Sequence, residues 1–185
     1  MPNFTRKAIK ESFWKLLNQR PLNQITIKDI VEDCGINRNS FYYHFQDLPA
    51  LIEEIMEEII DGIIKEHPPI ESVEDCLNVA ITFGVRNKRA IYHIYNSVNR
   101  DILERYLMEM CQYAVSTYIN TMFADASIEE QDKELLIRYY KCECFGQIIE
   151  WMNTGMSDSV LDEFHRLCLL RKGMADEFFR EISEM

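Results

Sequence analysis

Five polar side chains between residues 38 and 44 could bind nucleic acid: Arg38, Asn39, Tyr42, Tyr43 and His44. An arginine can form two hydrogen bonds with guanine and an asparagine two with adenine, so Arg38 and Asn39 have the chemistry to read base edges. The tyrosine hydroxyls and the histidine ring can donate hydrogen bonds to phosphates. Each residue taken alone would fit a solvated helix face equally well, but together they favour DNA.

A helix, a tight turn and a second helix are predicted to position these side chains. Thr26 and Asp29 have the spacing of a capping box, which begins the first helix. Gly35 stands where a residue with left-handed backbone geometry would end that helix. Asn37 follows as the N-cap of the second helix. So short a connection is typical of a helix-turn-helix that places its second helix in the major groove of DNA.

The second helix is predicted to have one apolar and one polar side. Phe41 and Phe45 are four residues apart and are expected to be buried together. The polar side is expected to face DNA. We assign contacts with DNA to the polar residues of this region, which are Thr26, Asn37, Arg38, Asn39, Ser40, Tyr42, Tyr43 and His44. Arg38 and Asn39 are assigned to bases. The two tyrosines, His44 and Thr26 are assigned mainly to phosphates.

Residues 5–51 resemble the DNA-binding domain of the TetR family of bacterial transcriptional regulators. The resemblance rests on IKDIV at 27–31, GINR at 35–38, SFYYHF at 40–45 and the Leu51 that opens a long linking helix. Leu48 departs from the pattern, because the family usually has a phosphate-contacting lysine there. The resemblance implies a homodimer that binds a palindromic double-stranded DNA operator, represses transcription and is released by a small-molecule effector. A co-regulator whose C-terminal domain binds a partner protein is the alternative.

Charge is divided unevenly along the chain. The 185 residues have a net charge of −11, which would repel DNA if it were spread evenly. Residues 1–50 hold seven Lys and Arg against five Asp and Glu, a net charge of +2, whereas residues 51–185 carry −13. The basic groups therefore lie with the helix-turn-helix. Arg6, Lys7 and Lys10 could touch a phosphate, although solvation is the commoner fate of such residues.

The apolar residues recur at intervals of three and four, which predicts an all-α fold of about nine helices. Three form a DNA-binding domain at residues 1–47, and the others form a larger ligand-binding and dimerisation domain at residues 48–185. Long helices are expected at about 5–19, 48–65, 100–123 and 157–182, and a short one at about 88–96. Ser72 and Ser127 are predicted to cap the helices that follow them, the second of which ends near Gly155.

A row of carboxylates follows the helix predicted at residues 48–65, on the side opposite its apolar stripe. These residues are Glu53, Glu54, Glu57, Glu58 and Asp61. We expect this face to be solvated, because charged side chains on one side of an amphipathic helix usually face water.

No enzyme motif is complete in this sequence. Cys142 and Cys144 lack the spacing of most zinc or redox pairs. A di-iron site in a helical bundle needs two Glu-x-x-His motifs, and only Asp162 with His165 comes near to one. We therefore expect no catalytic activity, no metal and no cofactor, with an enzyme in a helical bundle as the remaining alternative. The sequence has no apolar run of about twenty residues, and the expected location is the cytoplasm with reduced thiols.

Two clusters in the second half of the chain could bind partners. Aromatic side chains with polar tips are predicted to contact a small, largely apolar effector, and the residues are Tyr92, His93, Tyr106 and Tyr113. An aromatic core explains the same pattern. The last two helices offer more apolar surface than one face needs, and resemblance places the dimer interface there, at Trp151, Phe164, Leu167 and Cys168. An intramolecular helical hairpin would also use this surface.

Overall fold

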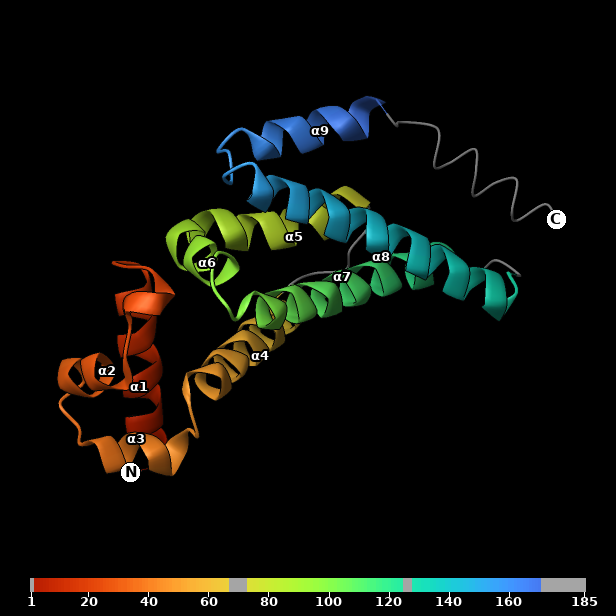
Figure 1. Ribbon diagram of the computed structural model, residues 1–185. Coiled ribbons are helices and arrows are strands. Elements are labelled where there is room, and N and C mark those ends of the chain that lie inside the picture. Colours follow the sequence, from red (N-terminus) through yellow and green to blue (C-terminus); the bar gives the residue numbers. More distant parts are fainter. Residues whose placement is uncertain (1, 67–72, 125–127, 171–185) are drawn as a thin grey trace. The chain divides into compact units, whose positions relative to one another are not determined.

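The computed structural model of the protein describes residues 2–66, 73–124 and 128–170, and within these ranges the chain is helical with no strand (Figure 1). The expected all-α fold is confirmed. The helices are α1 (Pro2–Leu17), a 3₁₀ turn η1 (Leu22–Gln24), α2 (Ile27–Asp33), α3 (Arg38–His44), α4 (Leu48–Glu66), α5 (Val73–Arg86), α6 (Lys88–Tyr95), α7 (Arg100–Met122), α8 (Glu130–Asn153) and α9 (Val160–Leu170).

Helix boundaries follow the predicted ones closely where the apolar stripe is strong. The helices α4, α6 and α7 each match the prediction within one residue at either end. Helix α1 runs from Pro2 to Leu17, so it begins three residues before the predicted start and ends two before the predicted end. Helix α8 begins at Glu130 after Glu129 as its N-cap residue. The predicted caps Ser72 and Ser127, and the last predicted helix beyond Leu170, lie outside the described residues.

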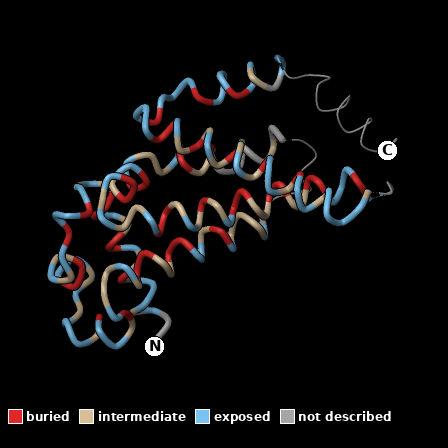
Figure 2. Tube along the Cα trace, turned by 45° about the vertical axis from the view of Figure 1, so that its right-hand side comes forward, coloured by how far each residue is buried: buried red, intermediate tan, exposed pale blue. Residues whose placement is uncertain are grey.

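The chain divides into two compact units. The first comprises Met1–Gly62 and Asn87–Tyr106, and the second comprises Ile63–Arg86 and Leu107–Met185. The first unit therefore holds more than residues 1–47, because most of α4, the whole of α6 and the beginning of α7 pack with the helix-turn-helix. Buried and exposed positions alternate along the long helices, as Figure 2 shows.

The core of the first unit joins α1, α2, α3 and α4. Its fully buried side chains are apolar and come from all four helices: Ile9, Phe13, Leu17, Ile30, Phe41 and Leu51. The hydroxyl of Ser12 is buried with them and donates to the carbonyl oxygen of Ile30 at 3.2 Å, which satisfies this buried polar group. Helix α6 also packs on α1, and the His93 Nδ1 lies 2.6 Å from the Leu17 carbonyl oxygen.

The second unit packs α5 against both α8 and α9. Gly84 on α5 faces the Trp151 ring, and a Cβ at Gly84 would lie only 2.8 Å from a ring carbon of that tryptophan. The indole Nε1 donates to the Ser157 carbonyl oxygen at 2.9 Å, so the ring is held on both its apolar and its polar side. Gly155, with φ of 90°, ends α8 as predicted.

A methyl group at Gly84 should destabilise the protein. Gly84→Ala places Cβ against a buried, hydrogen-bonded indole, and overpacking of this kind costs about 1–3 kcal/mol. Gly146→Ala is the matched control, because Gly146 is exposed on α8 with nothing within 4 Å of its Cβ position. That change should stabilise the helix by about 0.5–1 kcal/mol. Thermal unfolding compares the two variants, and equal midpoints would contradict the packing described here.

Candidate nucleic-acid interface

The N-terminus of α2 has the capping box that the sequence predicts. The Asp29 N–H donates to Thr26 Oγ1 at 3.3 Å, and the Thr26 N–H donates to Asp29 Oδ2 at 2.8 Å. The Thr26 hydroxyl itself donates to Asp29 Oδ2 at 2.6 Å. Its single hydrogen is therefore occupied within the cap, so any hydrogen bond from this hydroxyl to a phosphate requires Asp29 to be released.

The turn between α2 and α3 also follows the prediction. Gly35 has φ of 69°, a backbone conformation that favours glycine, and the Ile36 N–H donates to the Val31 carbonyl oxygen at 2.9 Å. Asn37 caps α3, because its Oδ1 accepts from the Ser40 N–H at 2.8 Å and from the Ser40 hydroxyl at 3.0 Å. Asn37 and Ser40 are thus hydrogen-bonded to each other, and these bonds stabilise the first turn of α3.

Helix α3 buries one side and exposes the other, as its pattern predicts. Phe41 is 0% and Phe45 is 3% exposed, whereas Tyr42 is 50% and Tyr43 is 78% exposed. Arg38 and Asn39 are exposed in the first turn. His44 is half-buried, and its ring meets that of Tyr43 edge to face with centroids 5.0 Å apart. The structure therefore brings Arg38, Asn39, Tyr42 and Tyr43 onto one accessible face of a short, rigidly capped helix.

The carboxylate of Asp29 stabilises the N-terminus of α2. Hydrogen bonds from the Thr26 hydroxyl and backbone N–H, and then from Arg20, lower the pKa of Asp29 from 3.8 to about 2. A carboxyl whose folded pKa lies below its unfolded value stabilises the fold above the unfolded value and loses that effect as the pH falls through the folded one. The stabilisation from Asp29 is therefore complete above about pH 5 and is lost between about pH 4 and pH 2.

Asp29→Asn should lower the unfolding temperature at pH 7 and remove part of the decline that the wild type shows between pH 4 and pH 2. Glu32→Gln is the control, because Glu32 is exposed on the same helix and pairs only with the exposed Lys28 at 3.7 Å. Thermal unfolding across this pH range tests the prediction. If the Asp29→Asn and wild-type curves run parallel, the cap does not carry the acid sensitivity.

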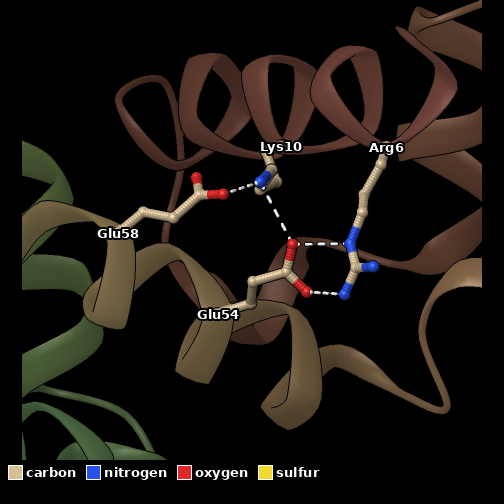
Figure 3. Close-up of polar contacts among 4 residues, drawn as sticks. All are labelled: Arg6, Lys10, Glu54 and Glu58. Atoms are coloured by element: carbon tan, nitrogen blue, oxygen red, sulfur yellow. Dashed lines mark hydrogen bonds and ion pairs between the residues drawn. The ribbon is translucent and has the colours of Figure 1, made fainter. Parts of the chain in front are cut away.

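The carboxylate row of α4 is exposed at Glu57, Glu58 and Asp61, as predicted, but the prediction is wrong at Glu54, whose side chain is 19% exposed and lies against α1. Figure 3 shows Glu54 and Glu58 directed at Arg6 and Lys10 of α1. Glu53 accepts from Arg105 at the start of α7 at 2.6 Å. A sequence signal existed: the two cations are four residues apart, as are the two carboxylates, which is the spacing of matching rows on two packed helices.

Family comparisons agree with this geometry. A model described as "Bacterial regulatory proteins, tetR family" matches residues 13–55, and one described as "Transcriptional regulator C-terminal region" matches residues 71–173. The second match alone covers more than half of the chain. The protein belongs to the TetR family. It is accordingly a DNA-binding transcriptional regulator of the TetR type, with its helix-turn-helix at α2 and α3.

Individual relatives of this TetR regulator are distant. A curated protein of Bacillus subtilis (strain 168), the uncharacterized HTH-type transcriptional regulator YxbF, is 28% identical over 93 residues. The match covers 50% of this chain but only 23% of that protein. The solved structure of the dihydroxyacetone kinase operon activator DhaS superposes with a TM-score of 0.72 over 90% of this chain and 95% of its own, at 19% identity. At that identity the likeness to DhaS concerns the fold.

The four residues predicted to contact an effector lie in different settings in this TetR regulator. Tyr92 is 43% exposed on α6. The next side chain, His93, is engaged with the Leu17 carbonyl oxygen at 2.6 Å and so helps to join α6 to α1. Tyr106 and Tyr113 are both half-buried on α7, the first in the first compact unit and the second in the other. The Arg105 guanidinium carbon lies 5.2 Å from the Tyr106 ring centroid.

The residues predicted at the dimer interface lie largely inside the subunit. Trp151 and Phe164 are each only 5% exposed, and Leu167 is half-buried. The side chain of Cys168 is outside the described part of the structure. A pocket of about 130 Å³ lies between α8 and α9. Its lining includes Trp151, Phe164 and Leu167 together with Glu150 and Glu163.

Cysteines and long helices suggest no further site in the described residues. Cys34, Cys111, Cys142 and Cys144 are free thiols, and burial raises the pKa of Cys111 far above its ordinary value. In the described ranges no three His, Cys, Asp or Glu side chains gather as metal ligands would. None of the helices described is both long and apolar enough to pass through a bilayer.

Proposed function

We propose that this TetR regulator binds a palindromic operator as a homodimer, with α3 of each subunit in the major groove. The observation that carries the proposal is the exposed face of α3, where Arg38 and Asn39 stand in the first turn while Phe41 and Phe45 anchor the opposite side. Recognition helices contact base edges mainly from their N-terminal residues, which supports base readout by these two side chains. Tyr42 and Tyr43 follow them on the same face and can donate to phosphates.

Exposed apolar side chains support dimerisation through α8 and α9. Of the large apolar residues exposed among those described, nearly half belong to these two helices: Leu135, Tyr139, Leu161, Leu169 and Leu170. Because Trp151 and Phe164 are already buried within the subunit, the exposed leucines are the better candidates for the interface. A two-fold dimer presents the same helix to both half-sites of a palindrome, which is the symmetry that paired recognition helices require.

Sedimentation with a duplex selected from a random library tests this proposal. We expect two subunits on each palindromic duplex. The double change Leu161→Glu with Leu169→Glu should give monomers, because it would bury unpaired charge in the interface. Val98→Glu is the control, since Val98 is 96% exposed in the α6–α7 loop. Dimers that persist with both leucines replaced would place the interface elsewhere.

For regulation, we propose repression by occupancy of the operator, relieved by a small-molecule effector in the cytoplasm. An effector can shift the protein only by its difference in affinity for the bound and released states, and full reversal takes roughly a 10⁴-fold preference. Deletion of the gene should raise expression from a reporter that carries the selected operator. A fall in expression would indicate activation, which is the role named for the structurally similar DhaS.

A partner protein is the second candidate for the regulatory signal. The pocket described between α8 and α9 has a volume of about 130 Å³. Pockets for drug-sized ligands hold about 300–1,000 Å³, so this one would take little more than a fragment. A small-molecule effector should raise the melting temperature of the protein in a screen of apolar and aromatic compounds. If no compound does so and a cellular protein co-purifies, the partner protein replaces the effector in this proposal.

A further inference from the structure

One cation of α1, Arg6, lies beside the C-terminal end of α3. The Arg6 guanidinium carbon is 5.3 Å from the centroid of the Phe45 ring, and Phe45 is the C-cap residue of α3. Lys10 is one turn further along α1. The Arg6 cation lies at the C-terminal end of α3, directly after the turn that holds Tyr42 and Tyr43, the residues proposed to hold phosphates. Its charge would ordinarily be an asset for binding DNA.

The charge of Arg6 is instead neutralised within the protein. Both oxygens of Glu54 accept from its guanidinium, Oε1 from Nε at 2.6 Å and Oε2 from Nη2, which is the bidentate arrangement (Figure 3). Lys10 Nζ donates to Glu54 Oε1 at 3.1 Å and also to Glu58. The side chains of Lys10 and Glu54 are only 15% and 19% exposed, so water screens this pair less than a surface pair, whereas Arg6 is 44% exposed.

Ionisation of the group supports the same picture. Burial tends to raise the pKa of Glu54, but hydrogen bonds from Arg6 and Lys10 outweigh it and leave that pKa below its ordinary value. The hydrogen bond with Glu54 raises the pKa of Arg6. Arg6 and Glu54 therefore both keep their charges at neutral pH, and the bidentate pair is maintained.

We propose that Glu54 limits the sequence-independent affinity of the protein for DNA by holding Arg6 away from the phosphate backbone. The inference rests on the proposed placement of α3 on DNA, because Arg6 of α1 lies against Phe45 at the end of that helix. Each phosphate contact made by a cation adds about 0.9 to the slope of log affinity against log salt. Releasing Arg6 should therefore strengthen binding to any duplex and make it more sensitive to salt.

Anisotropy titrations with a duplex of scrambled sequence, between 50 and 200 mM NaCl, test this inference. Glu54→Gln should bind more tightly at 50 mM NaCl and should steepen the salt slope by about 0.9, which is roughly a further 3.5-fold loss of affinity across this range. Glu57→Gln changes the net charge equally on the same helix, but Glu57 is exposed and the pairs of Arg6 and Lys10 remain intact. That control should retain the wild-type slope.

Arg6 variants make the test independent of the stability of Glu54→Gln. Because Arg6 makes no phosphate contact in this account, Arg6→Gln should keep the wild-type slope, and adding Arg6→Gln to Glu54→Gln should restore it. Glu54→Asp, which keeps the charge, should resemble the wild type. Equal slopes for Glu54→Gln and Glu57→Gln, or a shallower slope for Arg6→Gln, would overturn the inference. A wild-type protein that selects no operator would instead count against the placement of α3.

Discussion

Replacing Phe41 by alanine should cost the protein about 3–5 kcal/mol of folding free energy and with it most of its operator binding. The phenylalanine is completely buried, and its ring lies 5.8 Å from that of Phe45 between α3 and the rest of the first unit. Its loss leaves a cavity that the neighbouring helices cannot fill by moving, because caps fix both ends of the short turn before α3. Chemical denaturation followed by circular dichroism measures the change.

Tyr43→Ala is the matched control for Phe41→Ala. It truncates an aromatic residue two positions along the same helix, but Tyr43 is 78% exposed, so stability should change by less than about 0.5 kcal/mol. The two variants should therefore separate folding from recognition: both lose operator affinity, and only Phe41→Ala unfolds at lower denaturant. If Tyr43→Ala proved as unstable as Phe41→Ala, the two faces of α3 would have been assigned wrongly.

Arg38→Ala should weaken operator binding by about 1–3 kcal/mol and relax the preference at one base pair in each half-site. The reason is that a guanidinium with two hydrogen bonds to a guanine discriminates against other bases, whereas contacts with phosphates do not. Tyr42→Phe, which removes one hydroxyl donor, should weaken selected and scrambled duplexes by similar factors. Selection from randomised duplexes with each variant, followed by sequencing of the bound pool, measures both effects.

Arg86→Ala is the control for the loss of one positive charge. Arg86 is exposed in the last turn of α5 in the second unit and belongs neither to α3 nor to the α8 and α9 surface proposed for dimerisation. That variant should select the same motif as the wild type with nearly the same affinity. A motif unchanged by Arg38→Ala would remove Arg38 from base readout and leave it a phosphate contact at most.

Features that depend on neighbours in sequence were predictable. The capping box of Thr26 and Asp29, the left-handed Gly35 and the N-cap Asn37 each involve residues three or fewer apart, and all are present. Burial of Phe41 against exposure of Tyr42 follows from helical periodicity in the same way. The helix-turn-helix was therefore readable from local chemistry alone.

Contacts between residues distant in sequence could not be predicted from the pattern of a single helix. Arg6 and Glu54 are 48 residues apart, and His93 and Leu17 are 76 apart, so neither contact follows from the periodicity of one helix. Periodicity indicates that a side of a helix is polar, but water and a cation from another helix satisfy a carboxylate equally well. Apolar pattern has the same ambiguity, since Trp151 and Phe164 are as consistent with a dimer interface as with the intramolecular core they occupy.

Photocrosslinking from α3 tests the central claim, that this helix contacts the operator, most directly. A photoreactive phenylalanine derivative at Tyr43 should crosslink to the selected duplex, and scrambled competitor should not abolish the product. The same group at Tyr139, 63% exposed on α8, is the control and should give none. Crosslinks from position 139 but not from position 43, with operator binding intact in both proteins, would contradict the account.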